Sequence, residues 1–401
     1  MASAGSFSAD TEKDDVMTTV GCTPFSIHVS DDALDDLRRR LTQTRWPDEI
    51  PGAGWDYGVD PAYLRELCEY WASEFDWRAA EAEMNARPQF TTTIDGQNVH
   101  FLHVRSPFAQ ARPLLMVHGW PSTPLEFAKV LGPLTNPVAY GGSADDAFHV
   151  VAPSIPGYGW SGPTTARGWH VGRVGSALAE LMELLGYGRY GYFGTDMGAP
   201  IGTQLAQRFP DRLSGLYLTL LQSGLRPLDG VPTAEEQAQI EANDRRRAVD
   251  TGYVAMQSTK PQTLAYGLHD SPVGQAAWIV EKLRSWTDCD GDLESVMSKD
   301  EILAGVATFW FTGTAGSSAR LYYETAAFNG GGVQRPRVER VSTPTGIGVF
   351  PKELYPTSRR IANDHYAVEH WTEFARGGHF AAAEQPELLV GDLRTFFRGR
   401  G

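Results

Sequence analysis

Four short, almost entirely apolar runs divide the middle of the chain, and each is long enough for one buried strand. The runs cover Leu114–Val117, His149–Ala152, Tyr190–Phe193 and Leu216–Leu221. Apolar residues at helical spacing lie between or after them, over Val174–Leu185 and Ile201–Phe209. Apolar strands that alternate with helices are typical of a parallel sheet covered by helices on both faces. The pattern therefore predicts an α/β fold with a mostly parallel central sheet.

The N-terminal side of these runs has a different pattern. Ser30 can cap a helix whose leucines recur at helical spacing, and Asp60-Pro61 is a favoured start for a second helix. Further along, Asp95-Gly96 separates two runs of strand-like alternation, which predicts a β-hairpin. We therefore expect a helical N-terminal extension that leads into the sheet through a hairpin.

Strand-helix alternation stops after Leu221, and helical and aromatic signals take its place. It returns with the strand patterns Gly346–Phe350 and Ala367–Phe374 and a final helix over Pro386–Phe397. The intervening stretch is predicted to be a helical cap over the carboxyl edge of the sheet. The expected organisation is a disordered N-terminus (1–20), an N-terminal helical region (21–88), the first part of the core (89–224), the cap (225–340) and the second part of the core (341–401).

Charge and cysteine content exclude several classes of protein. The 35 Lys and Arg residues are outnumbered by 49 Asp and Glu, so the basic surface of a nucleic-acid-binding protein is not expected. The three cysteines are scattered and odd in number, which argues against a disulfide framework and a metal site. The polar N-terminus and the lack of a run of about 18 apolar residues predict neither a signal peptide nor a membrane anchor. We therefore expect a cytoplasmic protein without nucleic-acid or membrane partners.

Candidate chemistry begins at Gly194-Thr195-Asp196-Met197-Gly198, directly after an apolar run and before a helical pattern. This is the layout of a nucleophile elbow, a strained turn that pushes one side chain into an active site. Serine is the usual occupant, but here the residue is Asp196. A carboxylate with a reference pKa of roughly 3.9 is already ionised at neutral pH. Its attack on a strained or activated alkyl carbon gives an ester that water can cleave, so Asp196 points to epoxides, haloalkanes or similar substrates.

A carboxylate and a histidine follow in the order that an α/β-hydrolase requires. Glu353 lies just past a predicted strand, and His379 lies in a Gly-rich loop before the last helix. Asp364 is the second candidate for the acid that orients the histidine. The sequence therefore predicts a triad of Asp196, His379 and Glu353.

An oxyanion hole needs backbone N–H groups close to the elbow. His118-Gly119-Trp120-Pro121 follows the first apolar run and has the form expected after the third strand of such a core. The N–H groups of Trp120 and Met197 are the candidate donors. His118 is expected to hold structure through hydrogen bonds rather than to catalyse.

These motifs resemble those of the microsomal-type epoxide hydrolases of the α/β-hydrolase superfamily. The resemblance runs from about Thr23 to the C-terminus, and its N-terminal part looks like the extra region with which this family wraps the core and cap. Further matching motifs are Ser271–Gly274, Phe350–Leu354, Gly377–Ala382 and Glu384–Leu388.

The resemblance implies that two cap tyrosines donate hydrogen bonds to the epoxide oxygen. They match Tyr253 and Tyr322, with the neighbouring Tyr323 as an alternative to the second. It also implies conversion of an epoxide to a diol through an ester of Asp196, with no metal and no organic cofactor. A homodimer is one assembly that we consider.

Three other functions stay open at this point. A haloalkane dehalogenase-like hydrolase is testable by halide release, but Met197 stands where the halide-cradling Trp of such enzymes would be. Ester cleavage is disfavoured by an Asp at the elbow, and an inactive binding protein is disfavoured by a complete triad. The cap aromatics suggest an apolar or aromatic ligand, and we lean toward a role in natural-product biosynthesis, such as that of an antibiotic. These aromatics are Trp278, Trp286, Phe309 and Trp310.

Overall fold

The core of the molecule is a nine-stranded sheet within the part of the chain that a computed structural model describes, residues 21–221, 225–330 and 339–400. The expected disordered segment, residues 1–20, lies outside this part. The strand order is β1-β2-β3-β5-β4-β6-β7-β8-β9. The strands are β1 (Thr23–Pro24), β2 (Gln89–Ile94), β3 (Gln97–Val104), β4 (Arg112–Val117), β5 (Phe148–Pro153), β6 (Tyr190–Gly194), β7 (Leu213–Leu218), β8 (Val341–Val349) and β9 (Tyr366–Glu373).

Six neighbouring strands of this sheet run parallel, from β5 through β4, β6, β7 and β8 to β9. The other pairings, β1 with β2, β2 with β3 and β3 with β5, are antiparallel. The mostly parallel sheet predicted from the apolar runs is therefore confirmed, and so is the hairpin about Asp95-Gly96.

Helices cover both faces of the sheet, which explains why its strands are apolar on both sides. Successive strand residues point to opposite faces. In β4, Leu114 and Met116 belong to the cluster that holds α4 and α15, whereas Leu115 and Val117 belong to the cluster that holds α5 and α6. The helices on the two faces are α4 (Ala128–Thr135), α14 (Ala381–Glu384) and α15 (Pro386–Phe397) on one, and α5 (Val171–Leu184), α6 (Gly198–Arg208) and α13 (Arg359–His365) on the other.

Strand β7 differs from its prediction at both ends. The apolar run placed it at Leu216–Leu221, but it begins at Leu213 and ends at Leu218. Ser214 and Gly215 interrupt the apolar pattern and hid the start of the strand. A glycine is needed there because a Cβ atom at Gly215 would lie 2.9 Å from the ring of Phe396 in α15.

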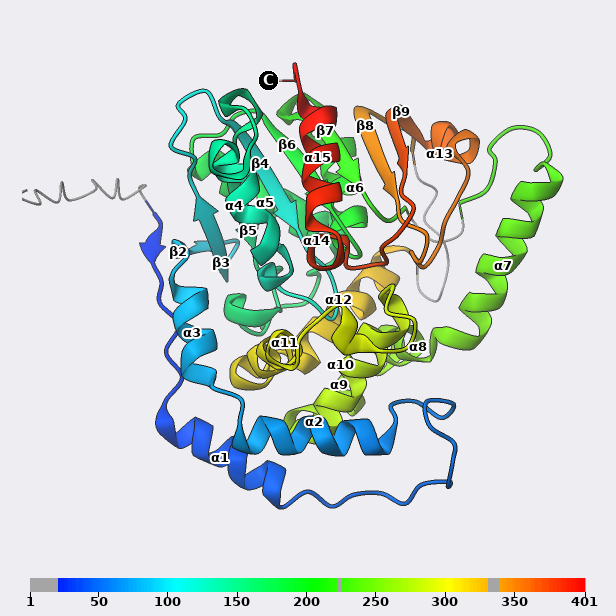
Figure 1. The fold of residues 1–401 in the computed structure, drawn as a ribbon. Helices are drawn as coiled ribbons and strands as arrows, with labels where there is room; N and C mark the ends of the chain where they lie inside the picture. Colours follow the sequence, from blue (N-terminus) through cyan, green and yellow to red (C-terminus); the bar gives the residue numbers. More distant parts are fainter. Residues whose placement is uncertain (1–20, 222–224, 331–338, 401) are drawn as a thin grey trace, which may run out of the picture.

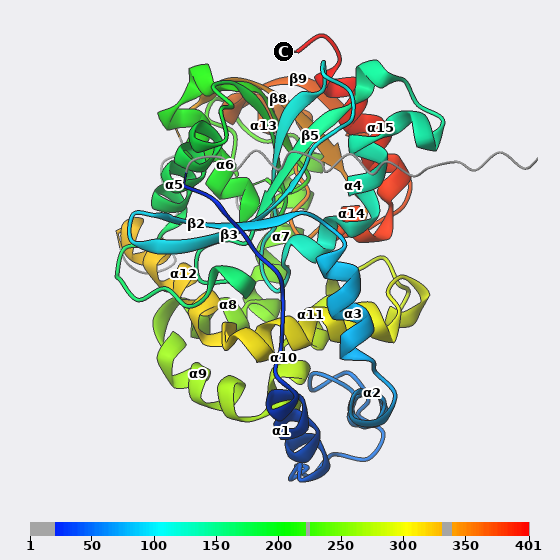
Figure 2. The same cartoon turned by 90° about the vertical axis from the view of Figure 1, so that its left-hand side faces the viewer.

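The segment between β7 and β8 forms six helices within the described residues, which we call the inserted helices. The inserted helices are α7 (Ala234–Asp250), α8 (Gly252–Thr259), α9 (Pro261–Asp270), α10 (Pro272–Trp286), α11 (Lys299–Thr312) and α12 (Ala315–Phe328). In Figure 1, α8 to α12 lie below the sheet and α7 runs beside it on the right. The N-terminal helices α1 (Asp31–Thr42) and α2 (Pro61–Ser73) lie on the far side of α8 to α12 in both views (Figures 1 and 2). None of the helices in the described ranges is both long and apolar enough to cross a membrane.

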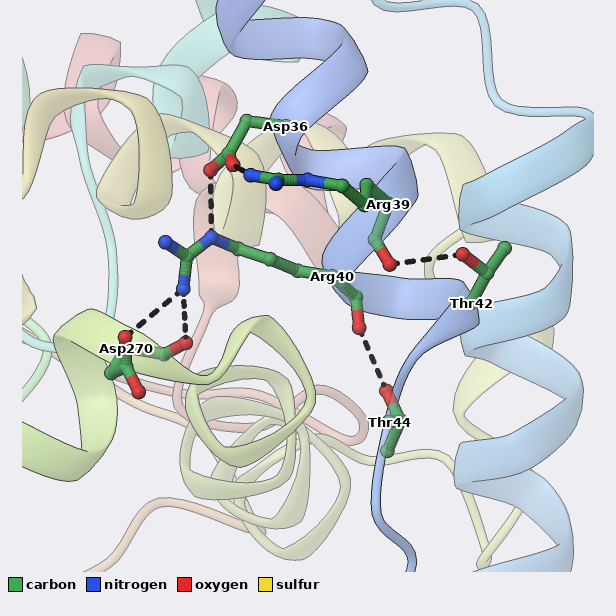
Figure 3. A network of polar contacts seen from close by, with 6 residues as sticks. All are labelled: Asp36, Arg39, Arg40, Thr42, Thr44 and Asp270. Carbon is green, nitrogen blue, oxygen red and sulfur yellow. Dashed lines mark hydrogen bonds and ion pairs between the residues drawn. The ribbon is translucent and has the colours of Figure 1, made fainter.

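The N-terminal helices α1 (Asp31–Thr42), α2 (Pro61–Ser73) and α3 (Trp77–Asn85) are attached to the inserted helices by polar contacts as well as by packing. In α1, the Arg40 guanidinium donates to the backbone oxygen of Asp270 at 2.8 Å and to its carboxylate at 3.0 Å, at the end of α9 (Figure 3). Asp36, one turn earlier, accepts from Arg40 at 2.6 Å and so orients it. In α2, the Tyr70 hydroxyl donates to Asp300 of α11 at 2.9 Å. These contacts hold the N-terminal region against the inserted helices.

Candidate active site

Asp196 occupies a sharp turn between β6 and α6. Its φ of +44° lies in the left-handed region, which a residue other than glycine adopts rarely and at a cost in energy. The turn also needs glycine beside it, because a Cβ atom at Gly198 would lie 2.0 Å from the backbone oxygen of Val117. A strand, a strained turn and a helix together project the Asp196 side chain beyond the carboxyl end of the sheet.

The Asp196 carboxylate lies between a backbone donor and a histidine, and only 8% of the residue is exposed. The N–H of Trp120 donates to Asp196 Oδ1 at 2.8 Å, and His379 Nε2 lies 3.2 Å from Asp196 Oδ2. A side chain at Gly119 would collide with the same carboxylate, since its Cβ atom would lie 2.0 Å from Oδ1. Met197 is the N-terminal flanking residue of α6, where helix N–H groups have no intrahelical partner. Both expected oxyanion donors are thus adjacent to Asp196.

His379 and Glu353 form a buried pair on the other side of Asp196. His379 Nδ1 lies 2.7 Å from Glu353 Oε1, and Glu353 Oε1 also accepts the N–H of Leu354 at 2.6 Å. This bond assigns the proton of the neutral imidazole to Nδ1. Among the described residues, Nε2 has no partner with hydrogen-bond geometry, despite its closeness to Asp196. When the imidazole is neutral, Nε2 is therefore the nitrogen that can take a proton from water.

Two opposing effects set the charge of His379. Burial disfavours the imidazolium, but the carboxylates of Glu353 and Asp196 outweigh it and raise the pKa of His379 well above its ordinary value. The other acid considered, Asp364, lies elsewhere, because its carboxylate accepts the N–H of Leu228 at 3.0 Å. The structure therefore pairs His379 with Glu353 and not with Asp364.

Two tyrosines of the inserted helices face this group. The Tyr253 ring in α8 stacks on the Trp120 ring with centroids 5.1 Å apart, and the Tyr322 ring in α12 lies 6.2 Å from that of Tyr253. Burial, reinforced by the charge of Asp196, raises the pKa of both phenols well above the ordinary value. Both hydroxyls therefore stay protonated as donors. Tyr323, the alternative to Tyr322, is 45% exposed.

The aromatic residues of the inserted helices do not all belong to the site. The Trp286 ring lies 5.1 Å from the His379 ring and 5.3 Å from that of Tyr253. The other three expected to meet a ligand are used in packing or bonding elsewhere. Phe309 packs on Tyr158, Trp310 lies under Arg40, and Trp278 donates its indole N–H to Gln257.

His118 has the structural role that the sequence indicated. It is fully buried, and its Nε2 accepts the N–H of Ile155 at 3.2 Å while Nδ1 lies 2.9 Å from the backbone oxygen of Gly119. Burial lowers the pKa of His118 to about 4, so the ring is neutral. Within the described ranges, no group of three His, Cys, Asp or Glu residues could hold a metal ion.

Glu126 is a buried carboxyl group near the site that no sequence motif indicated. It lies in the short turn Pro124–Phe127, which follows the motif His118–Pro121. Burial raises the pKa of Glu126 to about 7, while the Ser122 hydroxyl and the charge of His379 act in the opposite direction. Among the described residues its Oε1 has no hydrogen-bond partner. The sequence signal that could have identified Glu126 is a single acidic residue among the apolar residues of Pro124–Phe127.

The titration of Glu126 predicts a pH-dependent contribution to stability. With a pKa of about 7 against an ordinary 4.5, the folded protein keeps a proton between these values that the unfolded chain has released. The corresponding stability is present below pH 4.5 and lost as pH rises through 7. The wild type should lose this stability between pH 4.5 and pH 8, whereas Glu126→Gln has no carboxyl group to titrate. The free energy of unfolding of Glu126→Gln, relative to that of the wild type, should therefore rise by on the order of 3 kcal/mol between these pH values. Urea unfolding at the two pH values measures this, and a pH-independent difference would contradict it.

Two protein families and several known proteins match this chain. The family described as "Epoxide hydrolase N terminus" matches residues 22–127, and that described as "alpha/beta hydrolase fold" matches residues 112–270. A provisionally named epoxide hydrolase of Stigmatella aurantiaca is 45% identical over 94% of this chain and 85% of its own. Epoxide hydrolase 1 of Sus scrofa is 36% identical over 93% of this chain and 88% of its own. The structure of Aspergillus niger epoxide hydrolase superposes with a TM-score of 0.84 at 30% identity, over 96% of this chain and 97% of that one.

Proposed function

Since this chain belongs to the epoxide hydrolase family of the α/β-hydrolase fold, we propose that Asp196, His379 and Glu353 convert an epoxide to a vicinal diol through a covalent ester of Asp196. One observation carries the proposal. The carboxylate at the elbow has a backbone donor on one oxygen and a histidine beside the other, and two protonated phenols face it. Such an arrangement suits an electrophile that needs a nucleophile at carbon and a donor at oxygen.

The first step forms the ester. Oδ2 of Asp196 attacks one carbon of the epoxide, and the bond between that carbon and the ring oxygen breaks. Tyr253 and Tyr322 donate hydrogen bonds to the oxygen as it gains negative charge, which is where a fixed donor stabilises a transition state most. One of them passes its proton to this oxygen, which leaves a hydroxyl group on the ester and a tyrosinate. Trp120 meanwhile holds Oδ1, so Oδ2 is the oxygen left for attack.

The second step cleaves the ester. His379 Nε2 takes a proton from water, and the hydroxide attacks Cγ of Asp196. The N–H groups of Trp120 and Met197 stabilise the negative charge that develops on Oδ1. Glu353 holds the imidazole in orientation and stabilises its positive charge. The tetrahedral intermediate then loses the bond between Cγ and the ester oxygen, and that oxygen takes the proton of the added hydroxyl. The diol leaves, the Asp196 carboxylate is restored with one oxygen from water, and the imidazolium returns its proton to the tyrosinate.

Oxygen-18 water in a single-turnover reaction tests this route, with styrene oxide as the probe. The proposal expects the label in the Asp196 carboxylate and an unlabelled first-turnover diol, both read by mass spectrometry. A labelled diol with unlabelled Asp196 would mean direct attack by water and would overturn the ester mechanism.

Phenylalanine at either tyrosine should slow ester formation. Tyr253→Phe or Tyr322→Phe removes one donor to the developing alkoxide, a loss that is expected to cost about 10²- to 10³-fold in rate. Tyr323→Phe is the matched control, because this neighbour is 45% exposed. Rapid-quench mass spectrometry of the ester measures the rate. An equal loss with Tyr323→Phe and none with Tyr322→Phe would reverse the assignment of the second donor.

The aromatic walls favour an apolar or aromatic epoxide. The rings of Tyr253, Trp286 and Tyr322 all pack on the ring of Trp120, whose N–H donates to Asp196. Binding sites for apolar ligands are lined predominantly by such side chains. We propose that the inserted helices act as the cap of this site, because they supply three of these rings. A role in natural-product biosynthesis and a homodimer stay predictions.

A further inference from the structure

The loop that carries His379 is bonded to the end of helix α10, one of the inserted helices. The N–H of His379 donates to the backbone oxygen of Trp286 at 2.9 Å, and the N–H of Gly377 donates to Asp288 Oδ2 at 2.8 Å. The backbone of Gly378 lies very close to the backbone oxygen of Trp286, since a Cβ atom at Gly378 would be only 2.6 Å from that oxygen. Hydrogen bonds thus join the loop 377–379 of the core to Trp286 and Asp288 at the end of an inserted helix, and we call this contact the seam.

Glu384 fixes the backbone on both sides of His379. Its Oε1 accepts the N–H of Phe380 at 2.9 Å, and its Oε2 accepts those of Gly378 at 3.0 Å and Asp288 at 2.7 Å. One carboxylate therefore holds the residue before the histidine, the residue after it, and the segment that follows α10. Burial raises the pKa of Glu384, while the three N–H groups that donate to it act in the opposite direction and favour the carboxylate. Hydrogen bonds that N–H groups donate to a carboxylate are among the strong ones in proteins.

We infer that Glu384 and Asp288 are positioning residues, which hold the His379 imidazole in place through this seam and make its alignment depend on the inserted helices. The inference rests on the proposed role of His379 as the base that cleaves the ester. Fixing the peptides on either side of a residue fixes the position of its backbone and the direction of its Cα–Cβ bond, while the bond to Glu353 sets the rotation of the imidazole. A base displaced by about 1 Å loses on the order of 10²-fold in rate.

Glu384→Gln in the full-length protein tests the inference. The substitution keeps the shape of the side chain, but its NH₂ group cannot accept an N–H bond. Ester hydrolysis should slow by about 10- to 100-fold, while ester formation, in which the imidazole takes no proton, should stay within about twofold of the wild type. The ester should therefore accumulate in rapid-quench mass spectrometry. Glu387→Gln, at an exposed position in α15, is the matched control and should leave both rates unchanged.

Asp288→Ala is a second variant, which tests the same seam from its other side if Glu384→Gln does not fold. It should slow hydrolysis selectively as well. Equal losses in both steps would mean that these residues serve stability alone, and unchanged hydrolysis in both variants would mean that the seam does not align the base. Either result overturns the inference. His379→Gln, measured in parallel, separates the two proposals: if it traps no ester, the assigned base is wrong whatever the other variants do.

Discussion

Replacing Asp196 with alanine is expected to abolish diol formation, with a loss on the order of 10⁵- to 10⁶-fold in kcat, as for other nucleophiles of a triad. The proposed ester forms on this side chain, and the substitution also removes the partner of the Trp120 N–H. The two other buried carboxyl groups near the site do not stand at the elbow, because Glu353 is bonded to His379 and Glu126 lies in the turn Pro124–Phe127. The measurement is diol production from styrene oxide, with intact-protein mass to show that no ester forms.

Asp364→Ala is the matched control for this variant. It removes a carboxylate that accepts the N–H of Leu228 and does not contact His379, so turnover should stay close to that of the wild type. Normal diol formation by the Asp196 variant would refute the ester mechanism.

His379→Gln is expected to form the ester and then fail to cleave it. Attack by an ionised Asp196 needs no base, whereas general-base activation of water contributes about 10²- to 10⁴-fold. One equivalent of substrate should therefore remain attached, and a mass increase of the intact protein would show it. His28→Gln, at an exposed position, should turn over normally. Free turnover by His379→Gln with no trapped ester would assign the base elsewhere.

The charges of Glu353 and Asp196 predict that His379 titrates at a different pH in the free wild-type enzyme than in the ester intermediate. In the free enzyme the carboxylates of Glu353 and Asp196 both raise the pKa of His379. Esterification removes the charge of Asp196, so the pKa of His379 should be lower in the intermediate than in the free enzyme. The base must be neutral to act, and ester hydrolysis should therefore reach its plateau at a lower pH than the titration of free His379. Single-turnover rates against pH, beside an NMR titration, compare the two values.

The local pattern of apolar residues was enough to predict the parallel sheet, because most of its strands are apolar without interruption. The strands β4, β5 and β6 appear as such runs. Strand β7 was misplaced at both ends, and Ser214 and Gly215 interrupt the apolar pattern at its start. Strand β1 has only two residues, Thr23 and Pro24, and is defined by pairing with β2 rather than by its own composition. Elements that depend on a distant partner leave little trace in local periodicity.

For the site, residues that carry chemistry in a motif could be found, while those that act through packing could not. Asp196, Glu353 and His379 stand in a fixed chain order, and the structure brings them together. Tyr322 and Tyr323 are neighbours in sequence, but on a helix they point about 100° apart, so only tertiary packing separates a buried ring from an exposed one. The bonds of Glu384 link residues nearly a hundred positions apart, which no local pattern records.

The attachment of α1 and α2 to the inserted helices has a consequence for how members of this family can recombine. A hybrid chain that took residues 234–328 from another protein would lose the partner of Arg40 at Asp270 and that of Tyr70 at Asp300. The buried leucines of α1 and α2 share one apolar cluster with α10, so they would face a foreign surface as well. The N-terminal region and the insertion must therefore be exchanged together, although more than a hundred residues of core separate them in the chain.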